Sequence, residues 1–195
     1  MTITVGINGF GRIGRATLAH ISESLRTDIK VVKVNATGPL ETAAHLIKYD
    51  SVHGRFANEI TLGDGTMDLG KGPMQMFSTY DMNELDWDGC DVVLECTGKF
   101  NDGLKAKTHL DRGAQRVLLS APGKNVDKTI VFGVNDDTLT ADDLVPSPAG
   151  VRAQAVSRQC LRNDLLSMSS SARSRDNSAR MSSPAASPAM IDMST

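Results

Sequence analysis

The feature that most restricts the fold of this chain is a glycine-rich turn at residues 9–14, which fits the pattern G-x-G-x-x-G. An alternating apolar run at residues 3–7 leads into the turn and predicts a short strand. Residues 12–24 carry apolar side chains at spacings of three and four, which predicts a helix. Residues 28–35 are rich in β-branched side chains, which predicts a second strand. Together these segments predict a right-handed, parallel βαβ unit. The apolar positions expected on the helix are Ile13, Thr17, Leu18, Ile21 and Leu25.

The alternation of strands and helices continues beyond this first unit. We expect a helix at residues 40–49, small antiparallel strands within residues 59–79, a buried strand at residues 91–96, a helix at residues 102–110, and strands at residues 117–119 and 130–132. Such an alternation predicts an α/β fold of the Rossmann type, with a doubly wound and mostly parallel sheet. The pattern leaves the order of the strands open.

Each glycine of the turn has a physical reason to be there. Gly9 permits a tight turn, Gly11 lets the backbone approach a ligand closely, and Gly14 lets the helix pack on the strand. Free N–H groups at the start of the helix attract an anion, and the helix dipole adds to this attraction. In this strand-turn-helix context the motif predicts a site for the pyrophosphate of a dinucleotide. The alternative is a turn whose glycines serve only the fold.

The end of the second predicted strand bears on which dinucleotide is bound. A carboxylate about 20 residues after the motif usually holds the ribose hydroxyls of NAD. This place is occupied by Asn35, Ala36 and Thr37, so no carboxylate is present. Ala36 also removes the negative charge that would repel a 2′-phosphate, although no arginine lies beside it to bind that phosphate. We therefore expect weak discrimination between NAD and NADP.

The composition of the chain changes near residue 145. All nine Lys and all eight aromatic residues lie in residues 1–144, whereas residues 145–195 contain twelve Ser and four Pro. A segment with so few large apolar side chains cannot easily form a packed core. We therefore expect a dinucleotide-binding domain at residues 1–145 and a Ser/Arg/Pro-rich tail, unrelated to that domain, at residues 146–195.

Within this tail a short helix is possible at residues 151–166, and residues 167–195 are expected to be disordered. One interpretation is a flexible, solvated extension. The other is a shifted reading frame, because translation of GC-rich DNA in the wrong frame also loses Lys and aromatic residues abruptly.

Charge and cysteine content exclude several other classes of protein. The formal net charge of −2 gives no bulk attraction for nucleic acid or for an anionic membrane, so neither is expected as a partner. The N-terminus lacks the basic start and apolar stretch of a signal peptide, and we expect a cytoplasmic protein. The three cysteines are odd in number and form no Cys/His cluster, so neither a disulfide framework nor a metal site is predicted.

Four sequence blocks match more than a fold. They are residues 8–15, 49–56, 95–100 and 120–122. In order and spacing they resemble the blocks of phosphorylating glyceraldehyde-3-phosphate dehydrogenases, over residues 2 to about 145. The resemblance implies the NAD(P)-binding part of an oxidoreductase that acts on the aldehyde of glyceraldehyde 3-phosphate, in glycolysis, gluconeogenesis or carbon fixation. Erythrose-4-phosphate dehydrogenase shares these blocks and is an alternative.

The resemblance implies which residues bind the dinucleotide. Arg12 and Ile13 would contact the pyrophosphate at the start of the helix. Asn35 and Ala36 would line the adenosine pocket, with Ala36 in the place of the usual aspartate. The complete set of expected cofactor-binding residues is Asn8, Gly9, Phe10, Gly11, Arg12, Ile13, Gly14, Asn35, Ala36, Thr97, Gly98 and Ser120.

The later blocks extend this expected site toward the other end of the cofactor. Thr97 and Gly98 would run beside the cofactor at the end of a strand, and Ser120 would lie near the nicotinamide. Tyr80 falls where many relatives have an arginine near the adenine. The resemblance also implies a homo-oligomer for the full-length family.

The chemistry of the family needs a cysteine thiolate that a histidine activates, and hydride then passes to the nicotinamide. This sequence departs from the family pattern at residues 146–150, where that cysteine should follow. Cys160 lies in a different context, Cys96 falls on an apolar strand, and no histidine follows His109. We therefore expect no catalytic residue and an inactive, truncated or frame-shifted chain. The alternative to an enzyme is a dinucleotide-binding fragment without catalysis.

Overall fold

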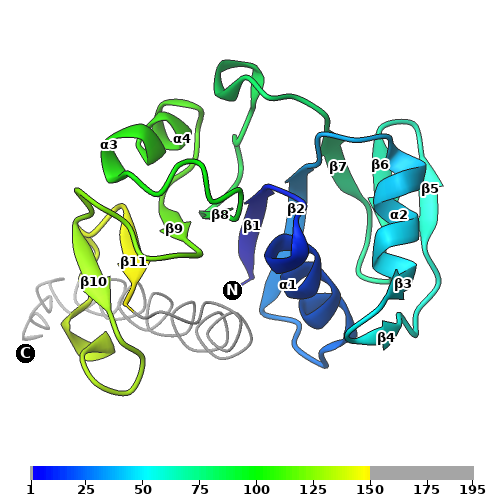
Figure 1. The fold of residues 1–195 in the computed structure, drawn as a ribbon, viewed down its shortest axis with the longest axis horizontal. Coiled ribbons are helices and arrows are strands. Elements are labelled where there is room, and N and C mark those ends of the chain that lie inside the picture. Colours follow the sequence, from blue (N-terminus) through cyan, green and yellow to red (C-terminus); the bar gives the residue numbers. More distant parts are fainter. Residues whose placement is uncertain (1, 150–195) are drawn as a thin grey trace, which may run out of the picture.

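Figure 1 shows the chain as a computed structural model in which residues 2–149 are described. Its centre is a seven-stranded sheet with the strand order β5-β6-β7-β2-β1-β8-β9, beside which lie the two-stranded sheets β3-β4 and β10-β11. The strands are β1 (Ile3–Asn8), β2 (Ile29–Asn35), β3 (Tyr49–Asp50), β4 (Gly54–Arg55), β5 (Thr61–Gly63), β6 (Thr66–Asp68), β7 (Met74–Phe77), β8 (Val92–Glu95), β9 (Val117–Leu119), β10 (Lys128–Ile130) and β11 (Pro146–Pro148). The helices are α1 (Arg12–Glu23), α2 (Leu40–Lys48), α3 (Gly103–Ala106) and α4 (Thr108–Asp111), with the 3₁₀ helices η1 (Met82–Glu84) and η2 (Asp136–Thr138).

The central part of the large sheet is parallel. The neighbouring strands β7, β2, β1, β8 and β9 all pair in parallel, and β5 and β6 extend the sheet in antiparallel fashion beyond β7. From β1 the chain moves outward to β2 and β7, and it then returns to the other side of β1 with β8 and β9. The strand order therefore switches between β1 and β8. In open α/β sheets, ligands bind at such a switch point, outside the carboxyl ends of the strands.

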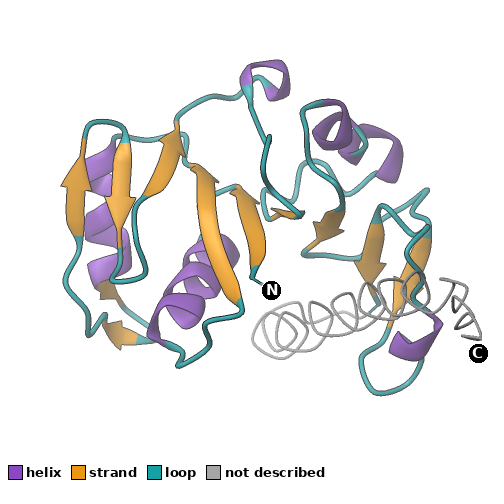
Figure 2. Ribbon diagram, turned by 180° about the vertical axis from the view of Figure 1, so that it is seen from behind, coloured by secondary structure: helices purple, strands orange, loops and turns teal. Residues whose placement is uncertain are grey.

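Alternate residues of the central strands face two different cores. Val5 and Leu94 belong to a core that α1 and α2 cover, and Figure 2 shows the strands in front of these two helices. Val93 packs with Trp87 in a second core on the opposite face. The same face of β1 carries Gly6, where an added Cβ would lie only 2.7 Å from the Trp87 ring. Both faces are covered, and the doubly wound α/β architecture predicted from the sequence is confirmed.

A bulge in β2 aligns the ends of three strands. Between the two halves of β2 the register with β1 shifts by one, and Val32 has no partner on β1. The last pairs of the ladder then join Asn8 to Asn35 on one side and to Glu95 on the other. Because side chains alternate along a strand, all three polar side chains lie on the face that Trp87 covers.

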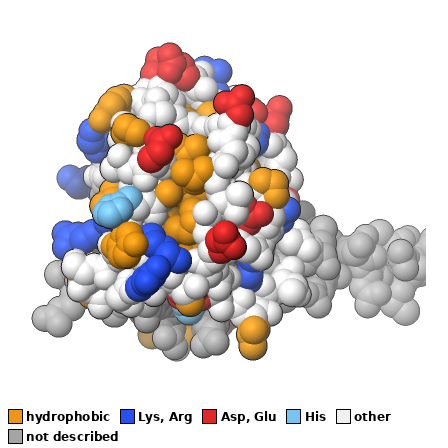
Figure 3. Space-filling model, turned by 90° about the vertical axis from the view of Figure 1, so that its right-hand side faces the viewer, with side chains coloured by type: hydrophobic (Ala, Val, Ile, Leu, Met, Phe, Trp, Pro, Cys, Tyr) orange, Lys and Arg blue, Asp and Glu red, His pale blue; other side chains and the backbone are white. Residues whose placement is uncertain are grey.

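The side of the molecule that carries α2 and β5 has a mixed surface. Figure 3 shows hydrophobic side chains among acidic and basic ones on this side. The exposed large apolar residues of this region are Leu46, Tyr49, Val52 and Leu62. The guanidinium carbon of Arg55 lies 5.8 Å from the centroid of the Tyr49 ring, so a cation covers part of this apolar surface.

The strand predicted at residues 130–132 is displaced. The structure has β10 at Lys128–Ile130, and it pairs with β11 in a separate small sheet. The carbonyl oxygen of Val131 accepts hydrogen bonds from the N–H groups of Val134 and Asn135, so the chain turns there. The apolar residues Val131 and Phe132 therefore lie at a turn, which the hydrophobic periodicity did not predict.

The prediction that Leu25 lies on the apolar face of α1 is wrong. The helix ends at Glu23, and Ser24 leaves it with an extended backbone at φ −70° and ψ 150°. The Lys71 ammonium donates a hydrogen bond to the carbonyl oxygen of Ser24, at 2.7 Å, where the chain leaves the helix. Leu25 is consequently fully exposed, at 100%.

Two other segments differ in detail from their predictions. Residues 59–79 form antiparallel strands as expected, but β7 also pairs in parallel with β2, which attaches the hairpin to the large sheet. The helix predicted at residues 102–110 is two short helices, α3 and α4, that are interrupted at Lys107.

Strand β11 lies beyond the domain boundary that we expected at residue 145. It pairs in parallel with β10, and the described structure continues to Ala149. The short helix at residues 151–166 and the disorder at residues 167–195, both expected from the sequence, lie outside the described residues. Within residues 2–149, no helix has the length and apolar character needed to cross a membrane.

The two leucines of the α1 region provide a matched test of this fold. Leu18 is fully buried between α1 and the sheet, so Leu18→Ala is expected to lower the free energy of unfolding by about 2–5 kcal/mol. Leu25→Ala should change it by less than about 0.5 kcal/mol, because this side chain is exposed. Urea denaturation followed by circular dichroism measures both values. Equal losses in the two variants would contradict this description of α1.

Candidate functional site

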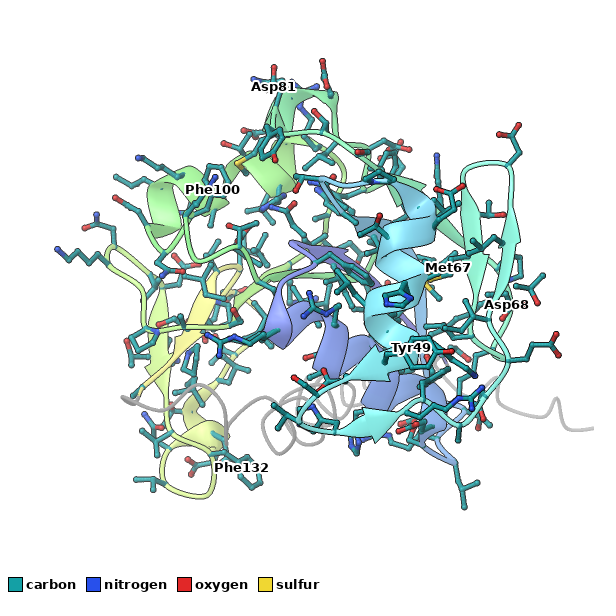
Figure 4. All side chains as sticks on the ribbon, turned by 45° about the vertical axis from the view of Figure 1, so that its right-hand side comes forward. Tyr49, Met67, Asp68, Asp81, Phe100 and Phe132 are labelled. Carbon is teal, nitrogen blue, oxygen red and sulfur yellow. The ribbon has the colours of Figure 1, made fainter. Side chains whose placement is uncertain are left out.

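A pocket of about 230 Å³ opens at the carboxyl ends of β1, β2 and β8, beside the switch point of the sheet. Its walls come from the turn after β1, the ends of β2 and β8, and the segment between β7 and β8. The lining residues are Asn8, Gly9, Phe10, Gly11, Asn35, Thr37, Thr79, Tyr80, Met82, Leu85, Cys96, Thr97, Lys99 and Phe100. In Figure 4, Asp81 and Phe100 mark the segments that follow β7 and β8 at this end of the molecule.

The turn at the bottom of the pocket needs glycine at its first position. Gly9 has φ +99°, a conformation that side chains disfavour, and an added Cβ would lie 2.7 Å from the backbone nitrogen of Thr97. The N–H of Gly9 donates to the carbonyl oxygen of Asn35, at 3.1 Å, and Arg15 Nη1 donates to the carbonyl oxygen of Phe10, at 2.9 Å. These bonds fix the turn against the end of β2 and against α1.

Two further glycines determine what lies at the start of α1. At Gly14 an added Cβ would lie 2.1 Å from the carbonyl oxygen of Gly9, so only glycine allows the helix to begin this close to β1. Gly11 is the N-cap of α1, and no side chain of the residues that the structure describes caps the first N–H groups. An added Cβ on Gly11 would meet nothing within 4 Å. The first turn of α1 therefore presents free N–H donors to open space, which favours an anion at this point.

The structure brings about half of the predicted cofactor-binding residues to the pocket. Those that line it are Asn8, Gly9, Phe10, Gly11, Asn35 and Thr97. Gly14 is buried directly behind the turn, Arg12 is exposed at the start of α1, and Ile13 is half-buried.

The remaining predicted residues lie beside the pocket and do not line it. Ala36 is packed in the core beneath α1 and α2, and its N–H donates to the carbonyl oxygen of Phe77. Thr37, one residue later, lines the pocket in its place. Gly98 is exposed with φ +72°, and Ser120 is half-buried behind Cys96 at the end of β9.

Several lining residues were missing from the predicted set. Thr37, Lys99 and Phe100 are sequence neighbours of predicted positions, so widening those blocks by one or two residues would have found them. Tyr80 was expected only near the adenine. The wall from Thr79 to Leu85 depends on the parallel pairing of β7 with β2, which the local sequence does not reveal.

Among the described residues that line the pocket, Lys99 is the only one with a charged side chain. Its ammonium nitrogen lies 5.6 Å from the centroid of the Tyr80 ring, so the two side chains face each other across the mouth of the pocket. Within residues 2–149, no carboxylate lines the pocket, and the electrostatics of this lining therefore favour an anionic ligand.

The cysteines of the described residues are poor nucleophiles. Burial raises the pKa of the Cys96 thiol to about 12, and the neighbouring charge of Glu95 acts in the same direction. Burial likewise raises the pKa of Cys90 to about 11. Neither thiol ionises appreciably near neutral pH. Within residues 2–149, no group of three or more His, Cys, Asp and Glu residues is arranged to hold a metal ion.

The fold, the glycine turn and the pocket at the switch point define a dinucleotide-binding domain of the Rossmann class. The sequence matches the profile described as "Glyceraldehyde 3-phosphate dehydrogenase, NAD binding domain" over residues 3–103, which is more than half of the chain. The chain belongs to the glyceraldehyde-3-phosphate dehydrogenase family, and it contains the NAD-binding domain of that family. Its cofactor is a nicotinamide dinucleotide, NAD or NADP.

Individual relatives agree with this assignment. A glyceraldehyde-3-phosphate dehydrogenase of Cereibacter sphaeroides is 54% identical over 157 residues, which cover 80% of this chain and 47% of the relative. The enzyme of the same name from Xanthobacter flavus is 50% identical over 76% of this chain and 45% of the relative. That from Lactobacillus delbrueckii subsp. bulgaricus is 43% identical over 75% of this chain and 45% of the relative. The chain thus spans about half the length of the curated relatives it matches.

Proposed function

We propose that the pocket at the carboxyl ends of β1, β2 and β8 holds the dinucleotide, with its pyrophosphate at the start of α1. The observation that carries this proposal is the open space in front of Gly11, next to free N–H groups of a twelve-residue helix. The diphosphate bridge is the anionic group that NAD and NADP share, and it fits donors of this kind. The adenosine end would then lie between Asn35, Thr37 and Tyr80, and the nicotinamide end would point toward β9.

For the whole protein we propose the activity that the names of its relatives state, a glyceraldehyde-3-phosphate dehydrogenase. In that reaction the aldehyde of the substrate is oxidised and the nicotinamide accepts a hydride. This domain contributes the binding and orientation of the dinucleotide. Erythrose-4-phosphate dehydrogenase remains the alternative activity. Assembly into a homo-oligomer and a cytoplasmic location, both expected from the sequence, are part of the same proposal.

The first prediction for the proposed function concerns two glycines of the turn, because an added Cβ has free space at Gly11 and none at Gly14. Gly11→Ala should change the free energy of unfolding by no more than about 1 kcal/mol, because its Cβ has room in the free protein. It should still weaken NAD binding at least about tenfold, because the Cβ would occupy the proposed phosphate position. Gly14→Ala should instead cost about 1–3 kcal/mol of stability, because its Cβ would collide with the carbonyl of Gly9.

Isothermal calorimetry with NAD and urea denaturation measure these two effects separately. A Gly11→Ala variant that folds and binds NAD as tightly as the unmodified chain would rule out the proposed phosphate position.

The second prediction concerns the choice of cofactor. Because the described part of the chain places no carboxylate in the pocket lining and Lys99 lies at the mouth of the pocket, the dissociation constants of NADP and NAD should differ by less than about a hundredfold, or 2.7 kcal/mol. Lys99→Met removes the charge that would attract a 2′-phosphate, so it should weaken NADP about threefold more than NAD. Lys105→Met, an exposed lysine on α3, is the matched control and should affect neither. A preference for NAD above about a hundredfold would contradict the prediction. So would an equal change of NADP affinity in Lys99→Met and Lys105→Met.

The third prediction concerns turnover. We propose that the 195-residue chain on its own does not reduce NAD or NADP in the presence of glyceraldehyde 3-phosphate and phosphate. Cys90 and Cys96 supply no thiolate near neutral pH, and the family's cysteine string does not occur in the sequence. The absorbance of the reduced nicotinamide measures turnover directly. Formation of reduced cofactor that depends on both substrates would refute this proposal and leave the binding site proposal untouched.

A further inference from the structure

A buried polar network lies behind the pocket, and its three fully buried members are not among the residues proposed to contact the dinucleotide. It joins Glu95 at the end of β8, His109 on α4 and Trp87 before β8. Each of these three side chains is fully buried, at 0% exposure, and none of them lines the pocket. The His109 Nε2 lies 3.1 Å from Glu95 Oε2, and the Trp87 indole Nε1 lies 2.9 Å from His109 Nδ1.

The indole fixes the proton of the histidine. Trp87 Nε1–H can only donate, so His109 Nδ1 must accept and carries no hydrogen. The ring hydrogen of His109 is therefore on Nε2, where it is donated to Glu95 Oε2. The histidine is consequently neutral, and Glu95 gains a donor but no positive charge.

Glu95 is held as a carboxylate by donors on both of its oxygens. Asn8 Nδ2 donates to Oε2 at 2.7 Å, beside the hydrogen bond from His109. The backbone N–H of Thr97 donates to Oε1 at 2.7 Å, and the Thr97 hydroxyl donates to the same oxygen. A buried charge is costly unless such donors compensate it. A glutamine in place of Glu95 would have an NH₂ group where one carboxylate oxygen now accepts, and this group would face a donor instead of an acceptor.

From Glu95 one branch of the network leads to the turn that begins at Gly9. The carboxylate fixes Thr97 through two hydrogen bonds, and the backbone nitrogen of Thr97 is the atom that an added Cβ on Gly9 would strike. Thr97 is thus held directly against the turn.

A second branch leads to the opposite wall of the pocket. Because Asn8 donates its amide N–H to Glu95, its Oδ1 is free to accept from Asn35 Nδ2, at 2.8 Å. Asn35 in turn pairs with the backbone of Thr79, whose N–H donates to Asn35 Oδ1 at 3.2 Å and whose carbonyl oxygen accepts from Asn35 Nδ2 at 3.1 Å. The orientation of both amides follows from the charge of Glu95, and the Thr79–Tyr80 wall is attached to the end of this chain.

We propose that Glu95 is a positioning residue for the dinucleotide. Its carboxylate sets the turn at Gly9 through Thr97, and it sets the Thr79–Tyr80 wall through Asn8 and Asn35. This inference rests on the proposed function of the pocket. It also makes Trp87, the only tryptophan of the chain, an indirect reporter of the bound cofactor, because His109 connects its indole to Glu95.

The test compares Glu95→Gln with Val93→Ala in the full 195-residue chain. Val93 is also 0% exposed, lies on the same strand and faces the same core, but it belongs to neither the network nor the pocket. Calorimetric titration with NAD gives the dissociation constants, at a temperature where circular dichroism shows each protein fully folded. Glu95→Gln should weaken NAD at least about fivefold, whereas Val93→Ala should lower the Tm and leave the dissociation constant within about twofold.

A separate titration follows the emission of Trp87 in the unmodified chain as NAD is added, with free tryptophan amide as the control for absorption by the ligand. We expect the emission to change on saturation, although the indole does not line the pocket. In Glu95→Gln at saturating NAD the change should be absent or reduced.

A loss of affinity below fivefold in folded Glu95→Gln, or an equal loss in Val93→Ala, would overturn the inference and leave the proposed function intact. If Glu95→Gln does not fold, the Trp87 titration of the unmodified chain tests the inference. A change of Trp87 emission on saturation with NAD supports the inference, and constant emission overturns it. An unmodified chain that binds no NAD at all overturns the proposed function and this inference with it.

Discussion

The site depends on the alignment of three strand ends in one hydrogen-bonded ladder. Asn8 pairs with Asn35 on one side and with Glu95 on the other. These pairs lie at the carboxyl ends of the strands, where the strand order switches between β1 and β8. Because this ladder is parallel, the segments that follow each strand leave the sheet at the same edge. The glycine turn, the end of β2 and the segment after β8 thus become three walls of one pocket. Shifting β2 by one residue would turn Asn35 toward the opposite core and separate these walls.

The sequence predicts the parts of this arrangement that have a local cause. The strand before Gly9, the helix from Arg12 and the β-branched second strand all form where periodicity and turn chemistry place them. Non-local pairing decides the rest. The bulge at Val32 and the parallel contact of β7 with β2 arise only when distant strands meet, so no window of neighbouring residues encodes them. Leu25 shows the same limit, because it continues the apolar spacing of α1 and yet lies beyond the last helical turn.

The candidate site divides in a similar way. The glycines and Thr97 belong to recognisable blocks, and they contribute backbone geometry that the motif itself demands. Ala36 occupies a motif position but is packed in the core. The family resemblance therefore identified the correct end of β2, but not Thr37, the residue there that lines the pocket. Lys99 and Tyr80 come from loops on opposite sides of the pocket, and their pairing is a property of the folded chain. The proximity of Lys99 and Tyr80, on which the proposed cofactor preference is based, is therefore shown only by the three-dimensional structure.

The buried charge of Glu95 explains why polar residues occupy the ends of three adjacent strands. An apolar cluster here would pack without any desolvation cost, and replacing buried ionic groups by apolar ones often stabilises a protein. An apolar cluster has no direction, however, whereas the bonds from Asn35 through Asn8 to Glu95 have donor and acceptor at fixed ends. The neutral histidine that Trp87 enforces leaves this carboxylate as the one full charge in the network. These directed hydrogen bonds give the pocket walls a fixed orientation, and a binding site requires such orientation of its walls.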